Sequence, residues 1–515
     1  MTLNLVLRWT DPSSQRCDAS AKPHGVEVSL PNRVKIELDD SYYPVDWSPQ
    51  YASDNASSRL WHRSLTYLPA LSEVPGGLAH TESILRDFAK FVSSKEGAIR
   101  VPSMDHALAI HIRVLHDLLE RCSLGGSDFA QIGKLATELL PPLLSAAREP
   151  GVRVPNNHGV MLSVSLMLIS VFRPSLVSDT DAASDAEVAL DQIRTIFDSD
   201  GMSNENTASY QGLYVKLLRD LCDLAELSER HSRLAGDLSE AYERASMAYR
   251  RILLPDGQVP PLGDGGMGRE IRFRPAPGKL VSCHNGLYVN SNEYSYIAIT
   301  SGARSPVHKQ MDDTSIMMWA FGRPVILDAG VQNYDASNRE AASFRTQPGH
   351  SGLFFKKFDD RPLKYFNSGG KGGGRKVEAS MVVSEGAEGD VIETRYELEG
   401  CTADRRILAR SPSAVTLTDR VWSPDGAGAV SRFLVSGAFE LHHQVGLLEA
   451  RDGDVWLRLK FEPSASYVSS FSQVSWSLSN RTRCWVIEFP VASGGRPQVI
   501  DVEVGSEYSP PGNRA

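Results

Sequence analysis

The sequence predicts an α+β multidomain protein in which a domain of antiparallel helix pairs precedes an antiparallel β-sandwich. Apolar residues recur at three- and four-residue spacing in the first half, whereas short alternating or β-branched runs fill the second half. A stretch dense in Pro and Gly, residues 255–268, separates the two patterns. At 515 residues the chain is also too long for one ordinary core.

The predicted helical domain covers residues 85–254, and residues 1–84 are a segment that leads into it. Short connections rich in Gly, Pro, Asp and Ser join the predicted helices, so successive helices are expected to be antiparallel neighbours. The helical patterns cover residues 106–122, 128–147, 157–172, 186–197, 209–227 and 233–253.

Residues 255–268 are the predicted linker, and residues 269–515 the predicted β domain. Many short strands at close spacing are typical of a large antiparallel sandwich. The strand patterns cover residues 287–300, 323–330, 378–386, 391–400, 414–422, 455–463, 483–490 and 497–505.

Charge and cysteine content exclude several classes of protein. The net charge of -9 argues against a general nucleic-acid binder, because affinity for phosphate backbones requires concentrated positive charge. The 6 cysteines are widely scattered and include no C-x-x-C pair. They are therefore expected to be thiols, not a disulfide framework or a thiolate zinc site.

Two apolar segments bear on where in the cell the protein is found. The first twenty residues contain only a short apolar stretch with no basic segment before it, which is unlike a secretory signal. Residues 160–172 are apolar but are interrupted by serines and too short to span a bilayer. We therefore expect a cytoplasmic protein without a membrane span; a secreted or periplasmic location would require a signal outside this sequence.

A glycine-rich segment at residues 367–376 leaves two interpretations open. It lacks the strand, the helix and the G-x-x-x-x-G-K-[ST] order of a phosphate-binding loop. It is either a flexible hairpin loop or a mobile lid whose Lys371 and Arg375 meet an anionic substrate.

Several motifs together resemble one enzyme family. HKQMDDTSIMMWAFGRPVILDAG, residues 308–330, is followed by SFRTQPGHSG at 343–352, and PNNHG and DGMSNENTASYQ lie at 155–159 and 200–211. These segments resemble heparinase II/III-like polysaccharide lyases, including the oligoalginate lyases and the heparinase III-type lyases. PDGQVPPLGD, residues 255–264, is similar to the connection between the domains of that family.

The resemblance implies a fold, a reaction and a partner. The helical domain would be an (α/α) toroid, incomplete because the N-terminal part is short. The enzyme would cleave a uronic-acid-containing polysaccharide or oligosaccharide by β-elimination, removing the C5 proton of the uronate and expelling the oxygen on C4. The implied partner is this acidic saccharide, with a homodimer as an option and no nucleic acid; the identity of the uronate stays open.

The first chemical requirement of β-elimination is to neutralise the substrate carboxylate. Asn157 and His158 are suited to this, because their N–H groups would donate hydrogen bonds that strengthen as enolate-like charge develops. They also lie at a predicted helix N-terminus, which favours negative charge. Asn156 would either bind substrate or cap the helix, and both interpretations stay open.

The second requirement is a base for the C5 proton and an acid for the leaving oxygen. Tyr210 is the candidate, since one phenol can take the proton and return it when both lie on one face of the sugar. A tyrosine, with a pKa of about 10, needs cationic or donor groups nearby to act as a base. His308 would act as base for the other C5 epimer or hold Tyr210 and the substrate in place.

Three further residues are candidates for the substrate site. Glu205 is expected to orient Tyr210 through a hydrogen bond. Arg304 and Arg345 lie near the matched segments and would supply the local positive charge that the acidic chain otherwise lacks.

Gln310, Asp328 and His350 occupy positions that resemble a structural metal site of the family, commonly two His and one Asp holding zinc. Here Gln310 stands at the first ligand position, and an amide oxygen is a poor zinc ligand compared with imidazole. The sequence therefore leaves open a structural divalent metal, as a harder ion than zinc, or a hydrogen-bonded polar core without metal.

Two departures from the family pattern favour an alternative function, a non-catalytic carbohydrate-binding or polysaccharide-assembly protein on the same fold. Gln211 replaces the histidine of the family motif, and Gln310 alters the metal set. A glycoside hydrolase is disfavoured, because Glu205 and Asp328 make no convincing pair of acids across a cleft.

Overall fold

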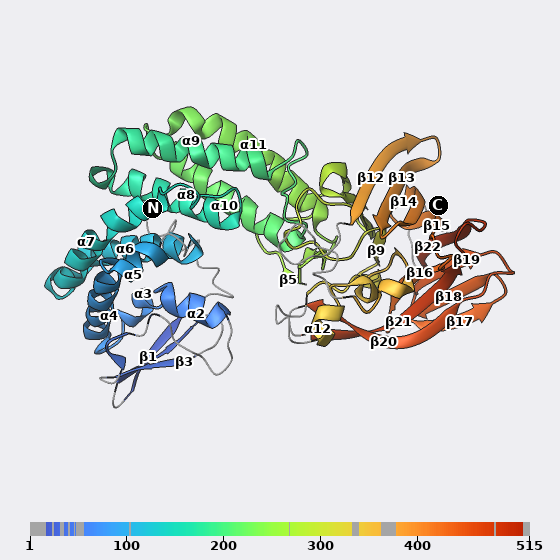
Figure 1. Cartoon of the computed structure of the whole chain (residues 1–515), viewed down its shortest axis with the longest axis horizontal. Helices are drawn as coiled ribbons and strands as arrows, with labels where there is room; N and C mark the ends of the chain where they lie inside the picture. Colours follow the sequence, from blue (N-terminus) through green and yellow to red (C-terminus); the bar gives the residue numbers. More distant parts are fainter. Residues whose placement is uncertain are drawn as a thin grey trace. The chain divides into compact units, whose positions relative to one another are not determined.

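The chain divides into two compact units in the computed structural model (Figure 1). Unit 1 comprises Met1–Ile196 and Lys216–Tyr242, and unit 2 comprises Phe197–Val215 and Glu243–Ala515. The structure describes residues 17–22, 25–30, 35–39, 42–45, 47, 56–101, 105–266, 268–331, 339–361, 377–477 and 480–507. The glycine-rich segment with Lys371 and Arg375 lies outside the described residues.

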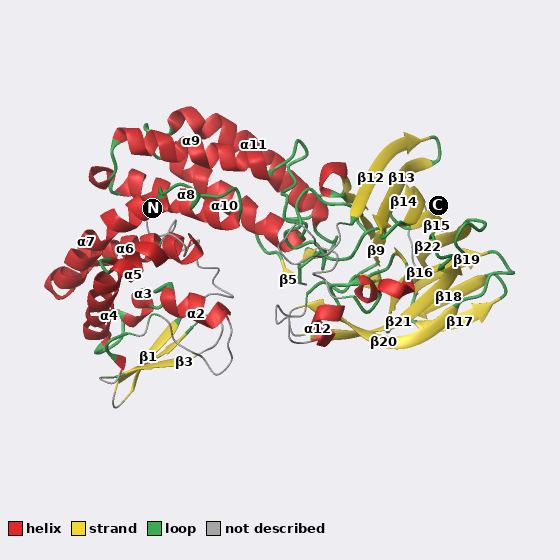
Figure 2. Ribbon diagram, in the orientation of Figure 1, coloured by secondary structure: helices red, strands yellow, loops and turns green. Residues whose placement is uncertain are grey.

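Unit 1 begins with a small antiparallel sheet and continues as helices (Figure 2). The strands are β1 (Asp18–Lys22), β2 (Gly25–Ser29) and β3 (Lys35–Leu38), paired in that order. The helices are α2 (Ala56–Arg63), α3 (Leu68–Leu71), α4 (Gly77–Val92), α5 (Lys95–Arg100), α6 (Asp105–Gly125), α7 (Ala130–Ala147), α8 (Asn157–Phe172) and α9 (Asp179–Ile196). Two more helices, α10 (Ala208–Glu226) and α11 (Ser232–Ile252), contain the division between the units.

The helices start earlier along the chain than the sequence pattern predicts. The first helix among the described residues begins at Ala56, before residue 85, and α4 buries Ile84, Leu85 and Phe88 completely. The β1–β2–β3 sheet was not expected either. The division between the units, which falls within α10 and α11, also differs from the predicted linker at residues 255–268.

Helix α8 shows why its apolar run is a core helix. It is buried from Gly159 to Ser170 on all sides, which is typical of a helix enclosed by others. The serines that interrupt the run are bonded inside the core: Ser163 donates to Gln192 at 2.7 Å, and Ser165 accepts from Arg113 at 2.9 Å. No helix in the described ranges is long and apolar enough to cross a membrane.

Unit 2 is built from strands after its short helical parts. Its first strands are β4 (Gln258–Val259), β5 (Gly268–Arg269), β6 (Gly278–Ser282), β7 (Leu287–Ser291), β8 (Ser295–Thr300), β9 (Ser315–Ala320), β10 (Arg323–Ile326) and β11 (Leu353–Phe354), with the short helix α12 (Arg339–Ser343) between β10 and β11. Then follow β12 (Glu378–Gly386), β13 (Gly389–Leu398), β14 (Cys401–Ser411), β15 (Ala414–Trp422), β16 (Ala429–Ser436), β17 (Glu440–Gln444), β18 (Leu447–Asp452), β19 (Val455–Phe461), β20 (Val468–Ser477), β21 (Asn480–Val491) and β22 (Gln498–Ser506).

Apart from β4 and β5, which pair with each other, these strands form two large antiparallel sheets. One has the order β20-β21-β16-β10-β9-β8-β7-β6, with β11 paired to β16, and the other has the order β12-β13-β14-β15-β22-β19-β18-β17. Both contribute to one apolar core, in which Ile297 and Phe433 of the first sheet and Ile407 and Val502 of the second are fully buried. Burial of each such side chain contributes about 1.5–3 kcal/mol. The predicted sandwich is thus confirmed.

The strands β9 and β10 form a tight hairpin. Phe321 and Gly322 connect them, and both have positive φ, 51° and 79°. Two central residues in this conformation match the right-handed twist of the strands that they join. Every residue of β9 is buried, as expected for a strand with both faces covered. The loop before β9 carries His308.

Candidate active site

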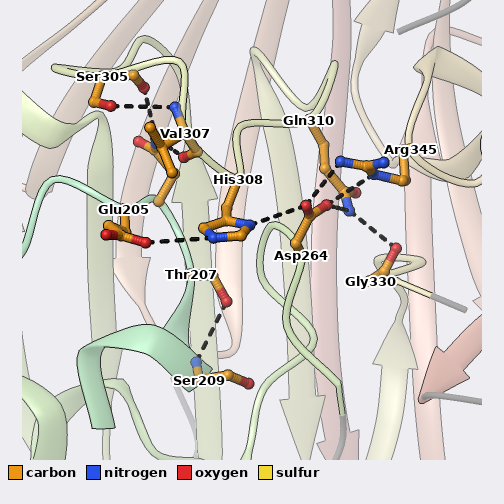
Figure 3. Close-up of polar contacts among 11 residues, drawn as sticks. Glu205, Thr207, Ser209, Asp264, Ser305, Val307, His308, Gln310, Gly330 and Arg345 are labelled. Atoms are coloured by element: carbon orange, nitrogen blue, oxygen red, sulfur yellow. Dashed lines mark hydrogen bonds and ion pairs between the residues drawn. The ribbon is translucent and has the colours of Figure 1, made fainter. Parts of the chain in front are cut away.

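Three loops of unit 2 meet around His308 (Figure 3). One contains Glu205 and Asn206, one contains Gly263 and Asp264, and the third precedes β9. Asn206 ties two of them together, because its amide nitrogen donates to the carbonyl oxygens of Ser305 at 2.7 Å and Val307 at 2.8 Å.

Close backbone contacts join the three loops. A Cβ atom on Gly263 would lie 2.1 Å from the carbonyl oxygen of Asn206, so only glycine fits there. The backbone N–H of Asp264 donates to the carbonyl oxygen of His308 at 3.3 Å. Asn206 and His308 both have φ of 55°, a strained conformation that persists only where the surroundings determine it.

The imidazole of His308 lies between two carboxylates. Its Nδ1 is 3.2 Å from Oδ2 of Asp264, and its Nε2 is 3.3 Å from Oε2 of Glu205 (Figure 3). Burial of the ring opposes its protonation, but the contacts with Asp264 and Glu205 outweigh this and raise the pKa of His308 to about 9. His308 is therefore an imidazolium at neutral pH, with a donor on each nitrogen.

Tyr210 stacks on this imidazolium. The two ring centroids are 4.0 Å apart and the ring planes make an angle of 27°. Tyr210 is half-buried on the first turn of α10.

Tyr214, one turn further along α10, also contacts Glu205. Its hydroxyl is fully buried and donates to Oε1 of Glu205. Burial, and then the negative charge of Glu205, raise the pKa of Tyr214. Tyr214 is thus a neutral donor that holds Glu205 toward His308.

Asp264 was not predicted as a site residue, although it ends the segment PDGQVPPLGD. Its side chain is 1% exposed and accepts from four donors. Arg345 donates to Oδ1 through Nε at 2.9 Å and to Oδ2 through Nη2 at 2.8 Å, and Gln310 donates to Oδ1 at 2.8 Å. The signal in the sequence is its place at the end of that segment, which resembles the connection between the domains of the family.

Gln211 lies in the core beneath this site. Its amide nitrogen donates to the carbonyl oxygens of Gly201 and Ala245, and its amide oxygen accepts from the N–H of Ser203 at 2.8 Å. The side chain is fully buried. Gln211 therefore fastens the loop that carries Glu205.

Asp328 and His350 are paired with each other. Nδ1 of His350 is 2.9 Å from Oδ2 of Asp328, and both side chains are buried. Burial opposes protonation of His350, but the charge of Asp328 outweighs it and raises the pKa of His350. Among the described residues, Nε2 of His350 and Oε1 of Gln310 have no hydrogen-bond partner.

Gln310, at the first position of the three-ligand set, offers only an amide oxygen, which is a poor zinc ligand. The amide nitrogen of Gln310 is bonded to Asp264 and to the carbonyl oxygen of Gly330, and Asp328 is bonded to His350. In the part of the chain that the structure describes, no group of three or more His, Cys, Asp or Glu side chains could hold a metal ion. We therefore derive no chemical step through a metal.

Of the remaining predicted site residues, three lie in unit 1 and one lies in unit 2. In unit 1, Asn156 caps α8, since its Oδ1 accepts from the N–H of Gly159 at 2.9 Å. The ring of His158 stacks on His106 with centroids 4.6 Å apart. Asn157 is half-buried at the start of α8. In unit 2, Arg304 is exposed on the loop before His308. Their predicted contacts with substrate stay predictions.

The sequence of this β domain matches a known family. Residues 281–490 match the family model described as Heparinase II/III-like, C-terminal, a range that includes His308, Gln310, Asp328, Arg345 and His350. The β domain is a heparinase II/III-like domain. The family expected from the sequence motifs is thereby confirmed. No curated protein matches the chain.

Solved structures confirm the fold beyond the heparinase II/III-like domain. A heparinase III structure has a TM-score of 0.69 at 13% identity, over 97% of this chain and 84% of its own. A mutant of the heparan sulfate lyase HepC from Pedobacter heparinus gives 0.68 at 13% identity, over 98% and 83%. A chondroitinase AC lyase gives 0.51 at 8% identity, over 86% and 75%. The chain therefore has the polysaccharide lyase fold, a helical toroid followed by a β-sandwich.

Proposed function

We propose that the protein is a polysaccharide lyase that cleaves a uronic-acid-containing polysaccharide or oligosaccharide by β-elimination. The observation that carries the proposal is the stack of Tyr210 on an imidazolium held between Glu205 and Asp264. A phenol beside a fixed cation can accept the C5 proton as a base and then return it to the leaving oxygen.

The geometry favours one of the two roles that the sequence left open for His308. Both ring nitrogens face carboxylates and act as donors, so His308 is engaged and not available as a base. Tyr210 then serves as both base and acid, and His308 stabilises its phenolate. Neutralisation of the substrate carboxylate by Asn157 and His158 remains part of the proposal, supported by the sequence motif alone.

This assignment predicts which uronates react. The hydrogen on C5 and the oxygen on C4 lie on the same face of glucuronate and mannuronate, and on opposite faces of their C5 epimers iduronate and guluronate. One phenol can serve both atoms only in the first pair. Oligosaccharides of glucuronate or mannuronate should therefore be cleaved, and those of the C5 epimers should not.

Ultraviolet absorbance of the unsaturated uronate end tests the proposal. Alginate blocks, heparan-type, chondroitin-type and bacterial exopolysaccharides are each incubated with the wild type and with Tyr210→Phe. We expect absorbance to rise on at least one of the substrates that contain glucuronate or mannuronate and to be lost in Tyr210→Phe. Tyr294→Phe is the matched control, because Tyr294 is a partly exposed tyrosine of the same unit outside the site, and it should keep full activity.

The alternative of a carbohydrate-binding or assembly protein predicts a different result. An acidic polysaccharide would be retained by the protein in a sedimentation or affinity assay, yet no substrate of the panel would give absorbance.

A further inference from the structure

We propose that Asp264 is a positioning residue of this site, held in place by Arg345 and Gln310, and that it acts on the reaction only through His308. The inference rests on the proposed elimination and adds a residue to it. Asp264 lies outside the range that matches the family model.

The hydrogen-bonding capacity of Asp264 is used completely. A carboxylate has about four acceptor sites, and Asp264 accepts two bonds from Arg345, one from Gln310 and one from His308. A carboxylate fixed by a bidentate guanidinium and an amide cannot turn. The Nδ1–H of His308 therefore has one direction in which to point.

Asp264 and Glu205 hold the imidazole of His308 at its two ring nitrogens. Arg345 pairs with Asp264 and Tyr214 donates to Glu205, so each carboxylate has a second partner that fixes its position. The ring held between them stacks on Tyr210 with centroids 4.0 Å apart. Asp264 together with Glu205 therefore fixes the face of the imidazole that Tyr210 contacts.

The backbone supports the same role. The N–H of Asp264 donates to the carbonyl oxygen of His308, and Asn206 holds the preceding loop through Ser305 and Val307. His308 has positive φ, so its side chain leaves the loop in a direction that few other backbone conformations allow. The side chain and the backbone N–H of Asp264 thus both hold the imidazole of His308 against the ring of Tyr210.

Asp264→Asn tests this role, since it keeps the shape and removes the charge. If Asp264 positions His308, kcat should fall by at least about tenfold while KM stays within about twofold, as for an interaction realised in the transition state. In a His308→Gln background, Asp264→Asn should lower kcat further by less than about twofold, because the effects of residues that act as a unit are not additive. Equal losses in both backgrounds, or a change in KM alone, would overturn the proposal.

Asp419→Asn is the matched structural control. Asp419 is another fully buried acid bonded twice to an arginine, Arg405, in the same unit. It should lower thermal stability and leave kcat unchanged below the unfolding temperature. If Asp264→Asn does not fold, Gln310→Met removes one of the donors that fix Asp264 and keeps its ion pair; a kcat unchanged in that variant would contradict the proposal.

A measurement without substrate separates this proposal from the proposed function. Nitrogen-15 NMR of the His308 ring should show protons on both nitrogens in the wild type and an altered Nδ1–H signal in Asp264→Asn. If the wild type makes no unsaturated product on any uronate, the proposed function fails. The ring signal of His308 then decides the role of Asp264 by itself. A His308 signal that is identical in the wild type and in Asp264→Asn would refute the positioning role of Asp264.

Discussion

His308 shows how single residues give this site its chemistry. A histidine on a loop would ordinarily titrate near pH 6.5, but two carboxylates and a buried position change its charge state. The sequence motifs predicted His308, Tyr210 and Glu205 as site residues, and the structure brings these three together. They could not predict Asp264, because its partners Arg345 and Gln310 lie far along the chain and meet it only through the fold.

The pKa of His308 predicts how stability depends on pH. The pKa is raised from 6.5 to about 9 in the folded protein, so folding favours the protonated ring. The resulting stabilisation is fully present below pH 6.5 and is lost as pH rises through about 9. Urea denaturation should show wild-type stability falling over this range relative to His308→Gln. Parallel pH curves for the two proteins would be evidence against a charged His308.

Tyr214 offers a second prediction for a single residue. Its hydroxyl is buried and donates to the charged Glu205, so Tyr214→Phe should cost about 1.5–3 kcal/mol of unfolding free energy. Tyr296→Phe is the control: Tyr296 is equally buried, but its hydroxyl has no hydrogen-bond partner among the described residues. That variant should lose no stability. Equal losses from both, measured by denaturation, would show that the hydroxyl bond to Glu205 contributes nothing.

At the scale of elements, periodicity predicted the central part of most helices and strands but not their ends. Helix α9 begins at Asp179 instead of residue 186, because Ser178 accepts from the N–H of Asp181 and acidic residues occupy the first turn. The hairpin β9–β10 was predictable, since its apolar runs and its glycine are local signals. The small β1–β2–β3 sheet was missed because its strands are only four or five residues long.

The start of α8 gives a prediction at this scale. Asn156 caps the helix through the N–H of Gly159, so Asn156→Ala should lower stability by about 1 kcal/mol. Asn156→Ser keeps a capping oxygen and should restore most of that loss. Thermal denaturation of the three proteins checks this. If Asn156→Ala is as stable as the wild type yet raises KM, Asn156 binds substrate instead of serving as the cap.

At the scale of the whole molecule, the sequence predicted the order of a helical domain and a β-sandwich because the change of periodicity runs across the chain. Whether the chain holds a metal depends on contacts between distant residues. Of the predicted ligands, Asp328 is bonded to His350, and Gln310 offers only an amide oxygen, which is a poor zinc ligand. We therefore expect the purified protein to contain no stoichiometric zinc.

Treatment with a chelator tests whether the purified protein contains a metal. Dialysis against a chelator should leave the thermal midpoint of the whole chain unchanged, and elemental analysis should find less than one ion per chain. A Gln310→His variant incubated with zinc serves as the comparison, since it restores the two-histidine set. One bound ion per wild-type chain, together with a lower midpoint after chelation, would show that the site holds a metal.

Product analysis in water labelled with heavy oxygen tests the central claim, β-elimination by a polysaccharide lyase, most directly. Elimination breaks the C4–O bond without adding water, so mass spectrometry should find no label in either product and an unsaturated end on one of them. Label in the products, with saturated ends on both, would mean that the bond is hydrolysed and would contradict the account of Tyr210 as base and acid.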